Sequence, residues 1–426
     1  MAEARESNET LISAPELPMA KPEDVGMSSE RFERIRPVMQ NYVDSKKVPG
    51  VATLIARHGK VVYLDTVGYR DVEAKAPMQA DTIFRIASMT KPIVSVALMT
   101  LFEEGRFLLS SPIKKWIPEF ANPMVARLNL PGQDGFGVPY ELVPSARDIT
   151  IRHLLTHTAG LASSYRGVLQ RDLAKISEYH SKNETVGDFV KRYAQLPLMA
   201  HPGEAWEYSR ATCVVGHLVE ILSGMTLDEY LKERIFKPLG MVDTHFYLPL
   251  EKLDRFAAQY TRDENGQIEL QDAPTPESRF VREPHTYFMG SGGLVSTISD
   301  YFRFNQMMLS RGQLEGVRIL SRKTVELMTT NHIGDLPVWL TGAWMGFGLG
   351  YGVAKDLGRD NTLTALQKGP NPWTPGTYTW GGAFCTFPFS DPTEKMTGLV
   401  MTQVRPYDHL DIRQDLVTMA NQAIAD

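Results

Sequence analysis

Strand-like segments lie near both ends of this chain, while helix-like segments fill the middle. The strand-like stretches cover residues 48–71, 346–354, 376–389 and 395–404. The first of them contains a turn at residues 58–60, so it predicts two strands. From about Ser111 to about Glu283, helix-like segments alternate with loops rich in proline and glycine. This order predicts one sheet built from both ends of the chain, with a helical region inserted between them.

Several segments have apolar residues at helical spacing and glycines or serines at their ends. The predicted helices lie in residues 28–47, 211–225, 226–241, 290–312 and 409–426, and a further one continues beyond Lys91 and ends at Gly105. The segments 131–139 and 367–377 combine proline and glycine and predict ordered surface loops near the site.

Size and charge restrict the classes of function. The chain has 426 residues, with 45 Lys and Arg against 50 Asp and Glu. This balance argues against binding to nucleic acid or to an anionic membrane. Only Cys213 and Cys385 are present, which predicts buried thiols and no disulfide framework. Residues 1–25 are acidic and polar and lack the pattern of a secretory signal, so we expect a loose arm on a cytoplasmic protein.

Ser88 and Lys91 lie three residues apart at the start of a strongly apolar stretch, residues 84–107. On a helix, this spacing puts both side chains on one face, where the ammonium group reaches the hydroxyl. A helix N-terminus also favours the negative charge that develops on an attacking serine. Ser88 is therefore a candidate nucleophile with Lys91 as its base. The same residues also fit a helix cap and a surface charge.

Other site types have weaker support. A second Ser-x-x-Lys pair, Ser111 and Lys114, is interpreted as a surface turn because Pro112 follows the serine. His153 and His157 are four residues apart, but the glutamate of a zinc-protease helix is missing, which favours structural histidines. The sequence has no Gly-x-Ser-x-Gly elbow and no phosphate-binding glycine loop. No metal site is predicted.

Four ordered blocks carry a resemblance to a known family: FRIASMTKP, RHLLTHTAGL, PGEAWEYSRATCVVGHLVE and GSGGLVSTISDYFRF. They resemble the serine β-lactamase-related family, in the branch of class C β-lactamases and family VIII carboxylesterases. The resemblance implies a β-lactamase/penicillin-binding-protein-like fold of the α/β plus α class. It further implies an antiparallel sheet domain from residues 26–86 and 285–426. The mainly helical domain is residues 87–284, with the active site in the cleft between the two.

In that family the second catalytic element is Tyr-x-Asn, and the matching residues here are Tyr208-Ser209-Arg210. Arg210 replaces the asparagine. If the guanidinium points inward, it would stabilise the Tyr208 phenolate and lower the pKa of the phenol. Pointing outward, it would only meet solvent.

The third family element matches Trp380-Gly381-Gly382-Ala383, the form seen in related esterases, where β-lactamases have Lys-Thr-Gly. Loss of the lysine removes the cation that would hold a β-lactam carboxylate. Two adjacent glycines in a strand also indicate a close approach to the backbone. Alternatively, Trp380 is a core residue beside two strand glycines.

The resemblance therefore implies a serine carboxylesterase that works through an acyl-enzyme. Ser88 would attack the ester, Lys91 and Tyr208 would move its proton, and the backbone N–H groups of Ser88 and Ala383 would hold the oxyanion. Trp380, Gly381, Gly382 and Arg210 would contact a small-molecule ester, with short acyl chains preferred because Trp380 limits the space. No cofactor, nucleic-acid or membrane partner is expected. Alternatives are an amidase or D-aminopeptidase, a weak β-lactamase, an acyltransferase and a non-catalytic binding protein. The oligomeric state cannot be derived from the sequence.

Overall fold

The computed structural model describes residues 14–128, 138–178, 183–355 and 372–426. Its main feature is an eight-stranded antiparallel sheet in the order β12-β13-β14-β15-β16-β1-β2-β3. The strands are β1 Gly50–Arg57, β2 Lys60–Asp71, β3 Ala76–Pro77, β12 Met345–Phe347, β13 Gly352–Ala354, β14 Tyr378–Thr379, β15 Thr386–Asp391 and β16 Met396–Met401. β1 pairs with β16 in the register Leu54↔Leu399. The predicted sheet from both ends of the chain is thus confirmed.

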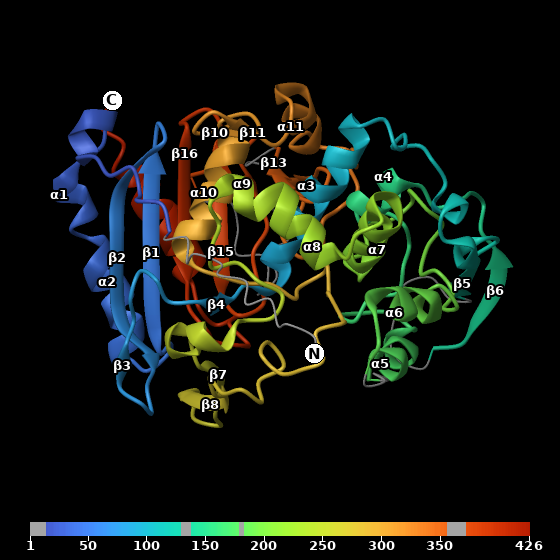
Figure 1. Ribbon diagram of the computed structural model, residues 1–426, viewed down its shortest axis with the longest axis horizontal. Helices are drawn as coiled ribbons and strands as arrows, with labels where there is room; N and C mark the ends of the chain where they lie inside the picture. Colours follow the sequence, from blue (N-terminus) through green and yellow to red (C-terminus); the bar gives the residue numbers. More distant parts are fainter. Residues whose placement is uncertain (1–13, 129–137, 179–182, 356–371) are drawn as a thin grey trace, which may run out of the picture.

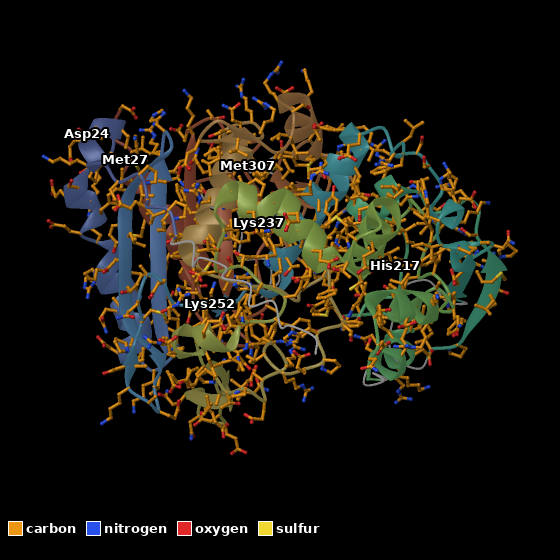
Figure 2. All side chains as sticks on the ribbon, viewed as in Figure 1. Asp24, Met27, His217, Lys237, Lys252 and Met307 are labelled. Carbon is orange, nitrogen blue, oxygen red and sulfur yellow. The ribbon has the colours of Figure 1, made fainter. Side chains whose placement is uncertain are left out.

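Some of the helices cover the two faces of this sheet. The helices in the described residues are α1 Ser29–Phe32, α2 Ile35–Asp44, α3 Thr90–Glu103, α4 Ile151–Leu155, α5 Gln170–Glu178, α6 Val186–Tyr193, α7 Ala211–Ser223, α8 Leu227–Leu231, α9 Lys237–Leu239, α10 Ile298–Leu309, α11 Arg322–Met328 and α12 Ile412–Gln422. α2 and α12 pack on one face, and α10 packs on the other. Figure 2 labels Met27 beside α1 and Met307 on α10.

Strand β1 shows why both faces must be covered. Ala52 and Leu54 belong to the apolar cluster shared with α3 and α10, whereas Val51 and Ile55 belong to the cluster shared with α2 and α12. Alternate residues of a strand point to opposite faces, so a strand that is buried throughout needs a layer on each side. All eight residues of β1 are buried.

The segment inserted between β3 and β9 (Val295–Ser296) holds α3 to α9 and three short strand pairings outside the main sheet. β5 Met124–Leu128 pairs with β6 Tyr140–Pro144, β7 Gln259–Arg262 pairs with β8 Ile268–Asp272, and β4 Phe84–Arg85 pairs with β9. The helices α4 to α7 lie beyond α3, away from the sheet (Figure 1). α3 itself packs against α7 and α8, and it therefore connects the two parts of the molecule.

The N-terminal arm differs from the expectation, and much of the two expected loops lies outside the described residues. The described part of the N-terminal arm is attached rather than loose: the Ala20 N–H donates to the Val61 carbonyl at 3.0 Å, and the Val61 N–H donates to Pro18. These bonds satisfy the free edge of β2. The expected loop at 131–139 lies mostly outside the described residues, as does the first part of the loop at 367–377. No helix in the described residues is long and apolar enough to cross a membrane.

The covering of both sheet faces leads to a stability prediction. Leu54 is fully buried at the centre of β1, whereas Leu108 is 67% exposed. We expect Leu54→Ala to lower the free energy of unfolding by about 2–5 kcal/mol, because it leaves a cavity in a close-packed core. Leu108→Ala, the matched control, should change it by less than about 0.5 kcal/mol. Urea unfolding followed by circular dichroism measures both, and equal effects would contradict this account of the core.

Candidate active site

Ser88 lies in a short 3-10 helix, Ala87–Met89, that leads directly into α3. Ala87 has φ 43°, in the left-handed region that residues with a side chain rarely adopt. This turn places Ser88 where the sheet and the helices meet, since the 3-10 helix also contacts β15. Backbone strain held in this way is common beside reactive groups.

The structure brings together the three residues for which the sequence suggested a catalytic role. Lys91 Nζ donates to Ser88 Oγ at 3.1 Å, and the Tyr208 hydroxyl donates to the same oxygen at 2.7 Å. All three side chains are buried, with Ser88 9% exposed. Tyr208 reaches Ser88 from the turn before α7, 120 residues away along the chain. A serine held between an amine and a phenol can lose its proton to one and have it relayed by the other.

Burial sets the protonation of Lys91. Desolvation lowers the pKa of its ammonium to about 8, and the charge of Arg210 acts in the same direction. The ammonium group also donates to the Ser291 carbonyl at 2.7 Å and lies 4.6 Å from the centre of the Tyr208 ring. These contacts fix the direction of Nζ towards Ser88. A substantial fraction of Lys91 is therefore neutral in mildly alkaline solution and able to accept a proton.

Tyr208 is protonated in the resting site. Burial raises the pKa of its phenol to about 12, although hydrogen bonds with Ser88 and Trp380 oppose this effect. The indole Nε1 of Trp380 donates to the phenol oxygen at 3.0 Å. Of the two groups that contact Ser88 Oγ, Lys91 is therefore the one that can be neutral and accept a proton in mildly alkaline solution, whereas Tyr208 keeps its proton.

Arg210 does not act on Tyr208 as the inward alternative required. Its guanidinium lies 5.8 Å from the Phe189 ring centre and contacts the Met289 sulfur, and it lines the cleft above Ser88. It is not left in open solvent either, because it is only partly exposed. The expected lowering of the phenol pKa is absent, since burial decides that pKa.

Residues 380–385 form a break between β14 and β15 rather than the continuous strand that the sequence suggested. A Cβ on Gly382 would lie 2.3 Å from the Ile86 carbonyl oxygen, so the glycine permits the sheet to approach the turn that carries Ser88. A Cβ on Gly381 would meet the Arg413 guanidinium at 2.9 Å. Ala383 follows this pair and lines the same cleft as Ser88.

Trp380 belongs to a compact aromatic cluster around the phenol ring of Tyr208. Its ring centre is 5.1 Å from that of Tyr208 and 5.1 Å from that of Phe347, and Trp206 stacks on Tyr208 at 5.9 Å. Trp380 is 6% exposed. It is thus both a core residue and a hydrogen-bond donor to the site, which combines the two alternatives raised by the sequence.

Sequence reasoning missed the contribution of His157. Its buried ring lies 5.1 Å from the Tyr208 ring, and burial lowers the pKa of the imidazole well below its usual value. A neutral imidazole there adds packing without a second positive charge beside Lys91. The block RHLLTHTAGL contained this residue, but the pattern alone could not place it against Tyr208. His153 instead caps α4, accepting from the Thr150 N–H.

Two cavities meet at Ser88 and share Tyr165, Tyr208, Ala383 and Arg405. The wider one has a volume of about 950 Å³. The other, of about 470 Å³, is lined by the aromatic side chains of Trp339, Trp344, Trp373, Trp380, Phe387 and Tyr407. Trp380 packs onto Tyr208 and also lines this smaller cavity beside Ser88. The preference for short acyl chains stays a prediction.

Comparison with known proteins identifies the class of this site. The Beta-lactamase family model matches residues 35–419, and the chain belongs to that family. It is 33% identical to protein Rv1367c of Mycobacterium tuberculosis over 374 residues, which cover 85% of this chain and 88% of the relative. It is 29% identical to Esterase EstB of Burkholderia gladioli over 392 residues, covering 87% and 89%.

A solved structure agrees with this assignment. The structure of "EstCE1, a hydrolase with promiscuous acyltransferase activity" matches with a TM-score of 0.75 and 27% identity, over 93% of this chain and 99% of that one. The β-lactamase-like fold and the resemblance to family VIII esterases are both confirmed.

The lowered pKa of Lys91 leads to a prediction about pH. Because only neutral Lys91 accepts the Ser88 proton, the rate of Ser88 acylation should rise with pH and reach half its maximum near about 8. Stopped-flow measurement of acylation by a p-nitrophenyl ester tests this, with folding followed by circular dichroism at each pH. A rate that falls steadily above neutrality in the folded protein would contradict the role of Lys91.

Proposed function

We propose that this protein is a serine hydrolase that cleaves small-molecule carboxylic esters through an acyl-enzyme. The observation that carries the proposal is the position of Ser88 Oγ between Lys91 Nζ and the Tyr208 hydroxyl. Relatives whose names describe esterases support it. The pair of cavities at Ser88 supplies space for the two halves of an ester.

In the proposed first step, neutral Lys91 accepts the Ser88 proton while Oγ attacks the ester carbonyl carbon. The backbone N–H groups of Ser88 and Ala383 are assigned to the developing oxyanion, where each donor is worth a few kcal/mol, roughly 2.7–4, of barrier. Tyr208 then donates its own proton to the leaving oxygen while it takes over the proton held by Lys91, and the alcohol departs. Water attacks the acyl-enzyme, gives its proton back through the same pair, and releases the acid.

Replacement of the nucleophile tests this mechanism. Ser88→Ala should reduce hydrolysis of p-nitrophenyl butyrate by more than about a hundredfold, since no other hydroxyl takes its place between Lys91 and Tyr208. Ser111→Ala is the matched control, because Ser111 belongs to the second Ser-x-x-Lys pair and its partner Lys114 pairs with Asp148 on the surface at 2.8 Å. It should keep normal activity.

Labelling with a fluorophosphonate complements the kinetics. Covalent modification of Ser88 in the unaltered protein supports a catalytic nucleophile, whereas an unlabelled Ser88 favours a non-catalytic binding protein. If Ser88→Ala retains more than about a hundredth of the activity, the assignment of the nucleophile is wrong.

Acyl transfer to an alcohol is a second candidate function. It is favoured by the width of the larger cavity, which leaves space for an acceptor once the first alcohol has departed. EstCE1 is described as a hydrolase with promiscuous acyltransferase activity. Both reactions share the acyl-enzyme and differ only in the group that attacks it.

Hydrolysis and acyl transfer can be distinguished by measuring how the acyl-enzyme divides between attack by water and attack by an added alcohol. With p-nitrophenyl butyrate and increasing 1-butanol, a transferase should form butyl butyrate while the release of p-nitrophenol stays constant or rises. A strict hydrolase should form butyric acid alone. Gas chromatography of both products measures the ratio, and Ser88→Ala should remove both.

A further inference from the structure

The wider cavity at Ser88 carries an unusual concentration of positive charge. Four arginines line it: Arg210, Arg279, Arg282 and Arg405. They come from three separate segments, namely the N-terminus of α7, the loop between β8 and β9, and the residues after β16. The whole chain has a net charge of −5, so this cluster is opposite in sign to the rest of the molecule.

These arginines lack carboxylate partners within the described part of the chain. None of the four forms an ion pair with a described carboxylate. Arg210 instead contacts the Met289 sulfur and the Phe189 ring, and Arg279 lies 4.7 Å from the centre of the Phe280 ring. The charge of Asp272 raises the pKa of Arg279, but the Asp272 carboxylate forms its ion pair with Arg85, at 2.7 Å. Arginines in proteins usually pair with carboxylates, so a group of four that do not is available to a ligand.

The acidic residues of the cavity do not neutralise the cluster. Glu184 pairs with Arg192, and the Glu283 side chain is 79% exposed and forms no ion pair with any of the four arginines. The arginines are also close enough to act on one another. Burial lowers the pKa of Arg279, and although Asp272 opposes this, the charges of Arg210, Arg405 and Arg282 lower it further.

The two cavities therefore differ in chemistry on either side of Ser88. The smaller is mainly aromatic and suits an apolar acyl group. Arg405 lines both cavities, and Arg413 also lines the smaller one, where its guanidinium donates to the carbonyls of Gly382 and Thr386. Arg210, Arg279 and Arg282 line the larger cavity and not the smaller. The larger is cationic and wider, which suits the alcohol half, because that half must leave before water enters. We propose that the alcohol half of the substrate carries an anion, a carboxylate or a phosphate, which Arg210, Arg279, Arg282 and Arg405 bind. This inference rests on the proposed ester cleavage and names its substrate class.

Matched esters test the proposal. The pair 4-carboxyphenyl butyrate and 4-carbamoylphenyl butyrate differs by one charge on the alcohol half. In the unaltered protein kcat/KM should favour the carboxylate by about tenfold or more, mainly through KM. The ratio should fall as sodium chloride is raised from about 0.05 to 0.5 M, since salt screens the attraction. 4-(Phosphonooxy)phenyl butyrate then shows whether phosphate or carboxylate is preferred.

Variants connect the preference to the arginines. Arg279→Gln and Arg210→Gln should bring the ratio close to one, whereas Arg279→Lys should keep part of it because the charge remains. Arg322→Gln is the control, because Arg322 is an exposed residue of α11 that pairs with Glu326 and lines neither cavity. It should leave the ratio unchanged. A ratio that is unaffected by all of the arginine variants would overturn the proposal.

The position of the anion is tested by moving it. Monophenyl adipate carries the carboxylate on the acyl half, and phenyl hexanoate is its neutral counterpart. We expect no advantage for the adipate. An arginine-dependent advantage there, with none for 4-carboxyphenyl butyrate, would overturn the assignment of the two halves.

Failure of this inference and failure of the proposed function give different results. If the neutral ester is cleaved in a Ser88-dependent way but the carboxylate has no advantage, the anion site is wrong and the esterase proposal stands. If neither ester is cleaved, the esterase proposal is wrong. Calorimetric titration with 4-hydroxybenzoate and 4-hydroxybenzamide then decides whether the anion site exists. Tighter binding of the benzoate that is lost in Arg279→Gln supports the anion site, and equal binding overturns it.

Discussion

The burial of one ammonium group is the constraint on which the rest of this structure depends. Lys91 is only 4% exposed, and its ammonium group contacts the Ser88 hydroxyl, the Ser291 carbonyl and the face of the Tyr208 ring. An unpaired charge in such a place would be very costly, and the lowered pKa of Lys91 is the consequence. The apolar packing of α3 between the sheet and the other helices is what keeps water away. The same packing that stabilises the fold therefore lowers the pKa of Lys91, which the proposed role as a base requires.

Close contact between the sheet and the turn at Ser88 supplies the second requirement. Gly382 lets the segment between β14 and β15 lie against the Ile86 carbonyl, and the same segment presents Trp380 to the phenol of Tyr208. Trp206 and His157 pack on other sides of that ring. Because these neighbours are rigid and neutral, the phenol keeps its proton and its direction. Tyr208 is therefore held by side chains from both parts of the molecule, and its position depends on their alignment.

Much of the fold could be predicted from local patterns, and less of the site. Alternating apolar residues and the turn at residues 58–60 gave β1 and β2, and the left-handed glycines Gly224 and Gly240 end helical segments as expected. The grouping of Ser88, Lys91 and Tyr208 followed from spacing together with the family resemblance. The direction of Arg210, the break after Trp380 and the pairing of the N-terminal arm with β2 did not, because each depends on a contact between segments distant in sequence. Periodicity contains no information about such contacts.

Charge around the nucleophile distinguishes among the chemistries that this fold permits. A substrate with a free amine, such as a D-amino acid amide, would bring a cation into a cavity that already holds four arginines and Lys91, and repulsion would oppose its binding. A neutral ester is not repelled by these charges, and an anionic ester is attracted by them. Arg210 stands where the family has asparagine, and it faces the cavity instead of the phenol. The Tyr208 phenol keeps its hydrogen bond with Trp380, while the departure from the family pattern adds positive charge to the cavity. Under the proposed function, the residues assigned to proton transfer and those assigned to substrate choice are therefore different residues of one site.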